Sequence, residues 1–463
     1  YNANQANEND NNKNREYPQI DQRIKATYIA ESTAQKTKLY DMYARFFRWA
    51  SDRLSENGVL ALITNRSFIE KKTFDGFRKT VAREFNNIYV VDLGGGVNDN
   101  SRLSGSKHNV FGIKTGVAIS FMVKRISGSK DKKFSRVFYV RRPEMETAEE
   151  KLDFLANNTA RSLSFDEIQP DKTNNWINLT NNDFDTLLPL ANKDTKAAKS
   201  GAKERAIFKL FSLGIVTNRD EWVYSEDSAI LLKKTQHLIT KYNADLAKLS
   251  VVRNSDKLAE MLDTSIKWTR AVKNDLRHGV TYELDEAAVE TSYYRPFVKR
   301  KLYFSRQLNE MVYQIPQLFG NEAGANQAFC FAAEDRSEFG IIAFDAMPNK
   351  DIFMPSAAQV LALYRFNAGQ RVDNITDWAL KQFTAHYKEA ASTGVGRMGT
   401  GKAQKITKEA IFHYCYAVLH DPLYREKYAQ NLKREFPRIP FYQDFWQWTA
   451  WGEALMKLHI GYE

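Results

Sequence analysis

Val59-Leu60-Ala61-Leu62-Ile63-Thr64 is a short, continuous apolar run that directly follows the turn residues Asn57-Gly58. A run of this kind is typical of a strand buried in a parallel sheet. Two similar runs follow it, over residues 88–93 and 116–123. A helix is expected between the first two runs, over residues 74–85. Strand, helix, strand and a returning strand together predict an α/β sheet.

The chain ahead of this stretch adds one more helix. Residues 1–24 are rich in Asn, Asp and Gln and are expected to form an exposed loop. Between Ile24 and Leu54, apolar side chains recur at helical spacing, which predicts one helix with one apolar face. Three strands and two helices cannot cover both faces of a sheet. The segment is therefore expected to hold only part of a Rossmann-like sheet.

The sequence changes character after Lys124-Arg125, where residues 127–133 form a linker rich in Gly, Ser and Lys. We therefore predict two domains, residues 1–126 and residues 127–463. The second domain combines short strands, helices and long polar loops, and it is expected to be mixed α+β and largely helical from about residue 406. Its main helices are expected over residues 225–272, 407–428 and 444–458, and its last aromatic cluster is expected to lie in the core: Phe441, Tyr442, Phe445, Trp446, Trp448 and Trp451.

The charge balance points to a polyanionic partner. The 463 residues include 67 Lys and Arg against 56 Asp and Glu, a net charge of +11. Such a balance favours nucleic acid as a partner, although a basic protein without that role has the same composition. An apolar run of about 18 residues is absent from the sequence, so a membrane partner is not expected.

Cysteine usage and the first residues bear on the compartment. Cys330 and Cys415 are isolated, so neither a disulfide scaffold nor a zinc site is expected. A reducing, cytoplasmic setting fits this usage best. The sequence begins Tyr-Asn-Ala-Asn, without an apolar stretch or an initiator Met. We therefore expect no signal peptide and a chain cut from something longer.

Several sequence blocks carry a resemblance to a known family. The blocks are Tyr1-Asn2-Ala3-Asn4-Gln5, Tyr17-Pro18-Gln19-Ile20-Asp21, residues 33–43, residues 62–69, Val91-Asp92-Leu93-Gly94-Gly95, Thr217-Asn218-Arg219-Asp220, Tyr294-Arg295-Pro296-Phe297 and Ile406-Thr407-Lys408-Glu409. In this order they resemble the type ISP restriction-modification enzymes, from just after the catalytic Asn-Pro-Pro-Tyr motif to the carboxy terminus. Those enzymes are single polypeptides with nuclease, ATP-driven translocase, N6-adenine methyltransferase and target-recognition parts.

The resemblance assigns functions to the two predicted domains. It makes residues 1–126 the carboxy-terminal half of the methyltransferase domain, and residues 127–463 the target-recognition domain. Tyr1 then becomes the catalytic aromatic of the motif, and the Asn-Pro-Pro that should precede it is absent. An adenine inside a duplex must be flipped out to reach a methyl donor, and the ring would stack on the flipped base. The alternative is a terminal tyrosine without a role.

The resemblance also implies the partners. The partners are double-stranded DNA and the missing nuclease, translocase and methyltransferase segments of the same polypeptide. The parent enzyme would methylate adenine N6 in a short asymmetric site and cleave unmodified DNA. This chain alone would bind DNA without transferring methyl groups.

The cofactors that the resemblance implies are expected outside this chain. Gly94-Gly95-Gly96 imitates the turn of an S-adenosylmethionine site, but an acidic partner about 20 residues on is missing, since the sequence holds no Asp or Glu between Asp99 and Asp131. The S-adenosyl-L-methionine site is therefore expected upstream, and ATP and Mg²⁺ are expected to serve the absent parts. No residue here is assigned to a cofactor or a metal.

Residues at the end of the first apolar run, and in a later loop, are candidates for DNA contact. Asn65, Arg66 and Ser67 follow a strand at its carboxyl end, where α/β folds bind ligands. They are expected either to face DNA or to form a helix-capping turn. Lys107 lies in a Gly/Ser loop and either contacts phosphate or is simply solvated.

The second domain supplies two more candidate segments. In the first, Thr217, Asn218, Arg219 and Asp220 are candidates, because Arg can pair with guanine and Asn with adenine. An internal Arg219–Asp220 pair that fixes the loop is the alternative. The second segment has cations without an acid and suits phosphate contact, or else forms a solvated face: Arg295, Lys299, Arg300, Lys301 and Arg306.

Two rival functions remain open from the sequence. One is a free-standing, non-catalytic DNA specificity module. The other is a methyltransferase that acts on RNA. A test for methyl transfer after the missing amino-terminal part is added distinguishes a specificity module from a methyltransferase. Competition between duplex DNA and RNA distinguishes a DNA substrate from an RNA substrate.

Overall fold

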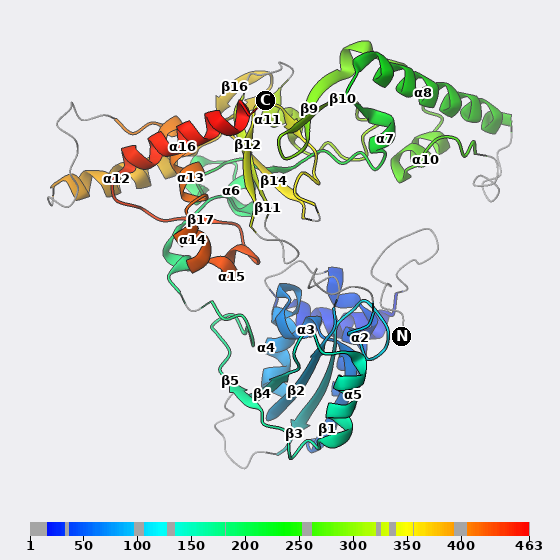
Figure 1. Ribbon diagram of the computed structural model, residues 1–463, viewed down its shortest axis with the longest axis vertical. Coiled ribbons are helices and arrows are strands. Elements are labelled where there is room, and N and C mark those ends of the chain that lie inside the picture. Colours follow the sequence, from blue (N-terminus) through cyan, green and yellow to red (C-terminus); the bar gives the residue numbers. More distant parts are fainter. Residues whose placement is uncertain are drawn as a thin grey trace. The chain divides into compact units, whose positions relative to one another are not determined.

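The computed structural model describes residues 16–32, 37–96, 106–126, 135–180, 182–251, 262–320, 326–332, 339–354, 356–392 and 405–462. The chain folds into two compact units, Tyr1–Asn181 and Asn182–Glu463 (Figure 1). Each unit has its own sheets and its own hydrophobic core. The two units are therefore described one after the other.

The first unit is built on a five-stranded sheet of order β1-β3-β2-β4-β5. The strands are β1 (Gly58–Asn65), β2 (Asn87–Gly94), β3 (Val117–Lys124), β4 (Arg136–Arg141) and β5 (Asp166–Ile168). The three strands predicted from apolar runs are confirmed. The expected parallel pairing of the first run is wrong, because β1 pairs antiparallel with β3, which also pairs antiparallel with β2. Strands β1 and β2 thus run in the same direction with the returning strand between them.

The helices of the first unit differ from the expected single long helix. They are α1 (Pro18–Ile24), the π-helical turn Lys25–Ile29, a 3₁₀ turn (Thr37–Tyr40), α2 (Met42–Ser51), α3 (Ser67–Glu70), a 3₁₀ turn (Lys72–Phe74), α4 (Asp75–Glu84) and α5 (Ala148–Asn157). The predicted helix over 24–54 is interrupted, because the extended residue Asp41 caps α2 by accepting a hydrogen bond from the Met42 amide. The predicted loop over 1–24 is wrong for α1, and residues 1–15 lie outside the described part.

One face of this sheet packs against helices. Leu60, Ile88 and Met122 point to that face and belong to a core with residues of α2 and α4. Burial alternates along β1, and its outward side chains Val59 and Ile63 are 58% and 56% exposed. Within the described residues, the outward side of β1 is therefore uncovered, and β1 has β3 as its one neighbouring strand.

The first unit continues past residue 126, where the sequence analysis ended its first domain. Strand β4 pairs parallel with β2, and β5 extends the same sheet. The buried guanidinium of Arg78 donates hydrogen bonds to the carbonyls of Asn174 (2.7 Å) and Phe68 (3.0 Å), and Trp176 lies in the core. These contacts tie residues 135–180 to the sheet, while the functional assignment of 1–126 and 127–463 stays a prediction.

The second unit contains two four-stranded sheets, in the orders β13-β9-β10-β8 and β12-β11-β14-β7. Their strands are β7 (Ser212–Leu213), β8 (Tyr224–Ser225), β9 (Val289–Arg295), β10 (Val298–Tyr303), β11 (Ala328–Ala332), β12 (Ile341–Phe344), β13 (Met347–Pro348) and β14 (Ala358–Ala362). Two short ladders join β15 (Tyr364–Asn367) to β16 (Gln370–Asp373), and β6 (Leu188–Pro189) to β17 (Arg438–Ile439). The prediction of a mixed α+β arrangement is confirmed.

Helices make up most of the rest of the second unit. They are α6 (Lys193–Ala197), α7 (Asp220–Val223), α8 (Ser228–Val251), α10 (Arg270–Arg277), α11 (Ile315–Phe319), α12 (Asp377–Ser392), α13 (Lys408–Val418), α14 (Pro422–Lys427), α15 (Ala429–Leu432) and α16 (Phe445–Ile460), with short 3₁₀ turns between some of them. Thr407 caps α13 by accepting a hydrogen bond from the Ala410 amide, 3.0 Å away. The helix predicted over 407–428 breaks where Asp421 caps α14 and Pro422 begins it.

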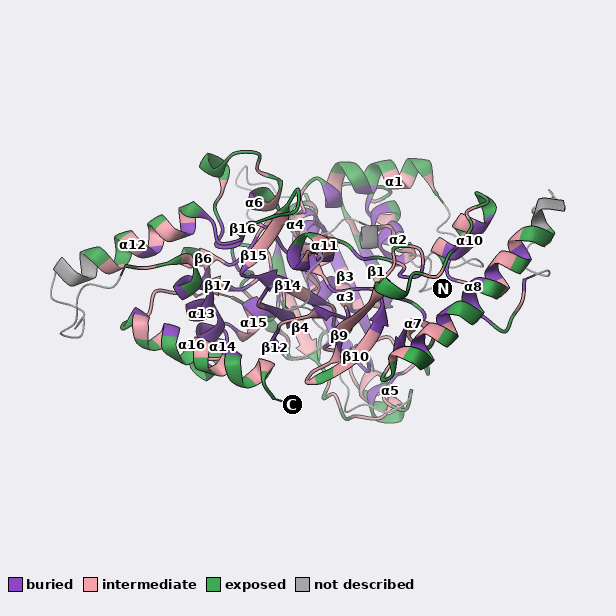
Figure 2. Cartoon of the chain, turned by 90° about the horizontal axis from the view of Figure 1, so that it is seen from above, coloured by how far each residue is buried: buried purple, intermediate pink, exposed green. Residues whose placement is uncertain are grey.

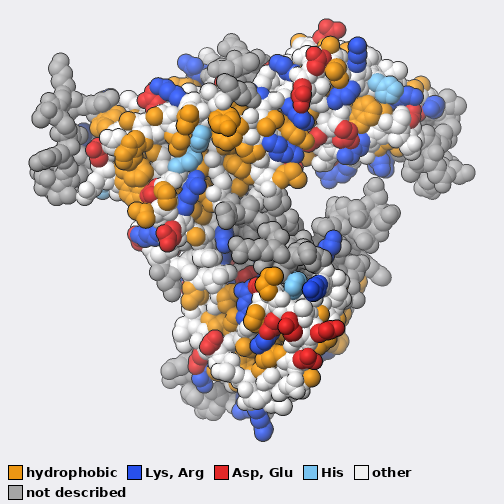
Figure 3. Space-filling model, viewed as in Figure 1, with side chains coloured by type: hydrophobic (Ala, Val, Ile, Leu, Met, Phe, Trp, Pro, Cys, Tyr) orange, Lys and Arg blue, Asp and Glu red, His pale blue; other side chains and the backbone are white. Residues whose placement is uncertain are grey.

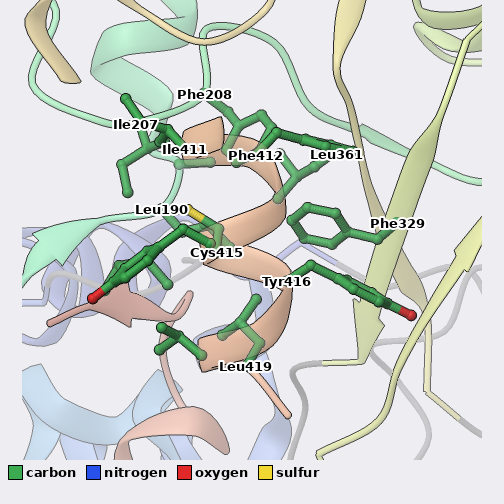
Figure 4. Close-up of a cluster of buried hydrophobic side chains, with 14 of the residues drawn as sticks. Leu190, Ile207, Phe208, Phe329, Leu361, Ile411, Phe412, Cys415, Tyr416 and Leu419 are labelled. Atoms are coloured by element: carbon green, nitrogen blue, oxygen red, sulfur yellow. The ribbon is translucent and has the colours of Figure 1, made fainter. Parts of the chain in front are cut away.

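Helix α13 runs through the core of the second unit. Its side chains pack against strands and loops from distant parts of the chain, including Phe208 and Phe329 (Figure 4). Cys415 lies in this core, and both cysteines are buried and free. Helix α16 approaches so closely that a Cβ on Gly452 would lie 1.9 Å from the His413 carbonyl oxygen. The core therefore requires glycine at that crossing.

The expected aromatic core at the carboxy terminus is largely confirmed. Phe445 is buried, and Phe441, Tyr442, Trp446 and Trp448 pack against the core, whereas Trp451 is 52% exposed. Figure 2 shows the same division, with buried strands and partly exposed outer helices α8, α12 and α16. Among the described residues, the helices are too short or too polar to cross a membrane, and His, Cys, Asp and Glu form no cluster suited to a metal ion.

Candidate nucleic-acid interface

The carboxyl ends of β1 and β2 meet at one edge of the first unit's sheet. Asn65 and Gly94, the last residues of these strands, both lie opposite Val117 of β3. In α/β folds this edge is where ligands bind. The residues that follow each strand are therefore the first candidates for a contact with DNA.

Arg66 does not face solvent at this edge. Its side chain is 3% exposed and donates hydrogen bonds to Asp92 at 2.8–3.1 Å and to Glu70 at 2.5 Å. The Asn65 side-chain oxygen accepts a hydrogen bond from the Ser67 amide at 2.8 Å, just where α3 begins. This contact closes a turn ahead of α3, although the N-cap residue Arg66 makes no side-chain cap itself, and the Arg66 cation is already paired.

The Gly94-Gly95 turn is filled by the chain itself. Both glycines have positive φ, 58° and 78°. A Cβ on Gly95 would lie 2.5 Å from the His108 carbonyl oxygen, and one on Gly94 would lie 3.4 Å from the Glu144 carboxylate. Glycine is needed here for close packing of the chain against itself. The residues described around this turn do not fit a site for S-adenosylmethionine, and the location of that site upstream stays a prediction.

Lys107 is exposed on the loop over 106–116, which leads into β3. Its carbonyl accepts a hydrogen bond from the Ala148 amide at 3.0 Å, so the backbone of the loop is held while the amine faces solvent. Lys107 is therefore free to contact phosphate in this unit. Tyr1 lies outside the described residues, and its catalytic role stays a prediction.

The hairpin of β9 and β10 is the most cationic segment of the second unit that the sequence singled out. Its register shifts between Val298 and Lys299, so Val298 lies opposite Arg295 while Lys299 lies opposite Tyr293. Tyr294 is the extra residue of this bulge. A bulge re-aims the side chain of the extra residue.

Two guanidinium groups lie over the ring of Tyr294. The Arg295 and Arg300 guanidinium carbons are 4.0 and 4.6 Å from the ring centroid. The ring therefore orders two cations by cation–π contact. Lys301 lies one residue further along, and its amine donates a hydrogen bond to the Thr291 hydroxyl at 3.2 Å.

The other cations of this segment are also placed around the hairpin. The Lys299 amine lies 5.2 Å from the centroid of the Tyr293 ring, and Arg306 is exposed in the loop after β10. At the hairpin tip, Phe297 adopts a positive φ of 60° and packs its ring against His459 and Tyr462. The end of α16 therefore holds the tip. Figure 3 shows that cations on this unit are interspersed with acidic and apolar side chains.

The loop that carries Thr217, Asn218, Arg219 and Asp220 has a rigid base and one exposed residue. Thr217 is buried, and its hydroxyl donates a hydrogen bond to Asp220 and accepts one from the Arg219 amide. Asn218 is exposed and has a positive φ of 53°. Its amide side chain is therefore presented to solvent from a fixed backbone.

Arg219 points the other way, into the unit. Its side chain is 1% exposed, and Nη2 donates a hydrogen bond to the Thr269 hydroxyl at 2.5 Å. Burial lowers the pKa of Arg219 to about 10. Arg219 is thus internal, as the alternative interpretation held, although its hydrogen-bond partner is Thr269 and not Asp220. A base could reach this guanidinium only if the loop opened.

Two hollows flank this loop. One has a volume of about 460 Å³ and is lined by residues 215–221 with Lys267, Asn349 and Asp351. The other has a volume of about 670 Å³ and lies between the loop and the hairpin, where Asp220 and Glu226 face Tyr294 and Arg300. The loop and the hairpin therefore form one surface.

Sequence reasoning missed Tyr294, Lys267 and Glu226 at this surface. A tyrosine immediately before Arg295 was the available signal for the first. Nothing local marks the other two, which come from distant segments. The sequence holds a further basic, Gly-rich loop over residues 394–405, and its residues 394–404, including Arg397 and Lys402, lie outside the described residues.

Solved structures of DNA complexes resemble the chain. A cryo-EM structure of a DrdV–DNA complex is 45% identical with a TM-score of 0.82, and the match covers 100% of this chain and 44% of that chain. A nuclease-deletion mutant of the Type ISP restriction-modification enzyme LlaGI, in complex with a DNA substrate mimic, is 28% identical with a TM-score of 0.77, and 99% and 40% of the chains are covered. The chain thus spans less than half of these relatives.

A third structure is the ATP-dependent Type ISP restriction-modification enzyme LlaBIII bound to DNA. It is 26% identical with a TM-score of 0.80, and 99% of this chain and 29% of that chain are covered. No curated protein matches the chain. The profile of the Type ISP C-terminal specificity domain matches residues 206–463, which is more than half of the chain. The chain therefore belongs to the Type ISP restriction-modification family and carries the C-terminal specificity domain of that family.

Proposed function

We propose that this chain is the DNA-reading part, and the later half of the methyltransferase part, of an enzyme that methylates adenine N6 at a specific duplex site. The second unit would hold the duplex and recognise its sequence. The first unit would complete the methyltransferase and receive the flipped adenine. The parent polypeptide would also cleave DNA that lacks the methyl group.

One observation carries the DNA-binding part of this proposal: the hairpin β9–β10 joins a fixed cationic surface to the loop around Asn218. Arg295 and Arg300 are ordered by the Tyr294 ring, and Arg300 also lies 3.4 Å from the exposed Glu226 carboxylate, so the hairpin holds its cations in place and binding would cost little side-chain entropy. Such cations would bind phosphates and set the register of the protein on the duplex. Asn218 is exposed beside them and would read a base edge, since Asn pairs well with adenine.

The sheet of the first unit supports the part of the proposal that concerns the rest of the polypeptide. Among the described residues, strand β1 is paired along one edge only, and its outward side chains Val59 and Ile63 are more than half exposed. An unpaired edge with apolar side chains is a liability unless another segment covers it. We propose that upstream methyltransferase residues cover this strand in the parent enzyme.

The chemistry is divided between this chain and the parts outside it. Tyr1 would stack on the flipped adenine and hold its amine in line for transfer. The methyl donor S-adenosylmethionine would be held upstream, because the Gly94-Gly95 turn is filled by His108. ATP and Mg²⁺ would serve the translocase and nuclease parts of the parent polypeptide.

A complementation experiment tests this proposal. The chain and the upstream part of its polypeptide are purified separately, mixed with S-adenosylmethionine and duplex DNA, and assayed for N6-methyladenine by mass spectrometry and long-read sequencing. We expect neither part to methylate alone and the mixture to methylate adenine within one short asymmetric sequence. Binding without methylation would favour a non-catalytic specificity module, and better competition by RNA than by DNA would favour an RNA substrate.

Charge-reversal variants connect the activity to the hairpin. Lys299→Glu with Lys301→Glu should abolish methylation by weakening DNA binding. The matched control is Lys381→Glu with Lys388→Glu on α12, which lies away from the hairpin (Figure 1). Equal losses from both pairs would show that only the net charge matters and would contradict a role for the hairpin.

A further inference from the structure

The loop over 106–116 of the first unit ends in an exposed apolar tip. Phe111 is 58% exposed and Ile113 is 38% exposed. The loop enters β3 at Val117, opposite the last residues of β1 and β2. The tip therefore stands at the sheet edge where α/β folds bind their ligands.

The base of the loop is held by Asn109, whose side chain is buried. Its amide donates hydrogen bonds to the carbonyls of Thr115 (2.7 Å) and Gly95 (3.3 Å), and its side-chain oxygen accepts one from the Phe111 amide (2.9 Å). Gly112 turns the chain at a positive φ of 64° and donates its amide to the Asn109 carbonyl at 3.0 Å. The side chain of Asn109 thus holds the two ends of the loop together.

A second anchor ties the same loop to α5. The Lys151 side chain has 0% exposure, and its amine donates a hydrogen bond to the His108 carbonyl at 2.7 Å. The His108 ring nitrogen Nδ1 lies 3.0 Å from the Glu146 carbonyl oxygen. The buried side chains of Asn109 and Lys151 therefore hold the tip outward, although its apolar side chains would gain free energy by folding back into the core.

The surroundings of the tip indicate its partner. Lys107 and Lys114 are exposed on either side of the apolar residues. A partner must therefore combine negative charge with an apolar interior within a few ångströms. Duplex DNA has this combination, with phosphates outside and stacked bases inside. Two apolar side chains are too few for a stable protein interface, which buries about 800 Å² on each side.

We propose that Phe111, supported by Ile113, is a wedge that enters the base stack beside the adenine to be methylated. This inference rests on the function proposed above and names the residue that opens the duplex. Removing a base from the stack leaves a gap, and Phe and Ile are among the apolar side chains that proteins insert between base steps. Lys107 and Lys114 would bind the flanking phosphates. The wedge would not contact the reacting atoms, so it is a positioning residue.

The test uses the full-length enzyme and duplexes with 2-aminopurine in place of the adenine that is found methylated by sequencing. Fluorescence of 2-aminopurine rises when the base leaves the stack. We expect Phe111→Ala to lower this rise and, on the matching duplex that keeps the adenine, to lower the methylation rate about tenfold. Binding to a duplex without the target, and the salt dependence of that binding, should stay unchanged. Phe111→Trp should retain the signal, and its own fluorescence should be quenched by stacking on bases.

The matched control is Ile126→Ala, because Ile126 is 62% exposed and follows β3 at the opposite end of the sheet. It should behave as the unchanged enzyme in every assay. A normal 2-aminopurine signal and a normal rate for Phe111→Ala would overturn the wedge and leave the proposed function intact. If the unchanged enzyme neither methylates nor gives a 2-aminopurine rise, the proposed function falls, and the wedge falls with it.

Discussion

Arg66 and Asp92 form a buried ion pair with two parallel hydrogen bonds, Nε to Oδ1 at 2.9 Å and Nη2 to Oδ2 at 2.8 Å. The pair joins the carboxyl ends of β1 and β2 across the intervening strand. The Tyr139 hydroxyl donates a third hydrogen bond to Asp92 at 2.7 Å. Burial acts to raise the pKa of Asp92, but the hydrogen bonds and charge of Arg66 outweigh it and hold that pKa below its ordinary value.

Breaking this pair should destabilise the first unit strongly. Asp92→Asn leaves the Arg66 cation buried without its main partner, which costs about 3–5 kcal/mol of unfolding free energy. Denaturant unfolding measures the loss. The control is Glu167→Gln, which removes an exposed pair with Arg136 and should leave the unfolding free energy unchanged within error, because solvent screens such a pair. A small loss for Asp92→Asn would mean that the pair contributes little.

The same pair gives a pH dependence with a definite sign. Because the folded-state pKa of Asp92 is lowered, its stabilising effect is fully present above its unfolded pKa. The effect is lost as the pH falls below about 4 and approaches the folded-state pKa. The first unit should therefore unfold in acid, and Asp92→Asn should show a shallower dependence in that range. Parallel curves for both proteins would contradict this account.

Asn218 and Arg219 are neighbours, but one is exposed and the other is buried, so only the substitution of Asn218 should change DNA discrimination. Asn218 is exposed, so Asn218→Ala should reduce discrimination between target and random DNA by about 1–3 kcal/mol if it reads a base. Arg219 is 1% exposed, and two of its guanidinium nitrogens have no hydrogen-bond partner among the described residues. Arg219→Met should therefore leave discrimination unchanged and alter stability by no more than about 1 kcal/mol.

Binding titrations on target and random duplexes, with thermal unfolding alongside, separate the two residues. Asn218→Gly serves as the control for the backbone, because glycine keeps the positive φ while the side chain is lost. It should lose discrimination as Asn218→Ala does. If Arg219→Met instead relaxes discrimination with normal stability, the loop opens on DNA and the arginine reads a base after all.

The hairpin cations should act on affinity without changing sequence preference. The plot of log K against log salt has a negative slope, and each phosphate contact that is lost should make this slope shallower by about 0.9. Tyr294→Ala should make the slope shallower than a variant of one cation does, because the lost Tyr294 ring orders both Arg295 and Arg300. Tyr294→Phe keeps the ring and should bind normally. A slope that is the same in all variants would place the phosphates elsewhere.

Local signals in the sequence were enough to predict much of the fold. The runs that became β1, β2 and β3 are apolar and are bounded by turn residues, and Thr407 marked the start of α13. Strand β4 could not be assigned to the first sheet, because its pairing with β2 is made across a segment that resembles a linker. Long-range pairing leaves no local pattern.

The site was harder to predict for a related reason. A charged side chain after a strand suggests a surface contact, and Arg66 becomes internal only because Asp92 lies 26 positions away. Arg219 is internal and donates its hydrogen bond to Thr269, which lies 50 positions along the chain and therefore gives no local signal. Phe111 was overlooked because an exposed aromatic is noticed only once burial is known. Composition and charge identified the cationic hairpin, but not the bulge that aims Tyr294.

His420 gives the second unit its own response to acid. Its ring nitrogen Nδ1 lies 2.8 Å from the Tyr416 carbonyl oxygen, while Nε2 is buried and has no partner within the described residues. Burial, together with the nearby charges of Arg425 and His459, lowers the pKa of His420 to about 4, although the hydrogen bond with the Tyr416 carbonyl acts to raise it. The folded unit therefore favours the neutral ring.

The sign of the resulting pH effect follows from this lowered pKa. Between about pH 6.5 and about pH 4, His420 is protonated in the unfolded chain but neutral in the folded unit. Stability therefore falls as the pH falls through that range. Over the full range, His420 should lower the free energy of unfolding of the second unit by about 3 kcal/mol. Denaturant unfolding at both ends of the range measures it, and His420→Gln should remove that share. His413 and His459 also have lowered pKa values and keep their own contributions in the variant. An unchanged pH dependence in His420→Gln would therefore assign the acid response to those two histidines.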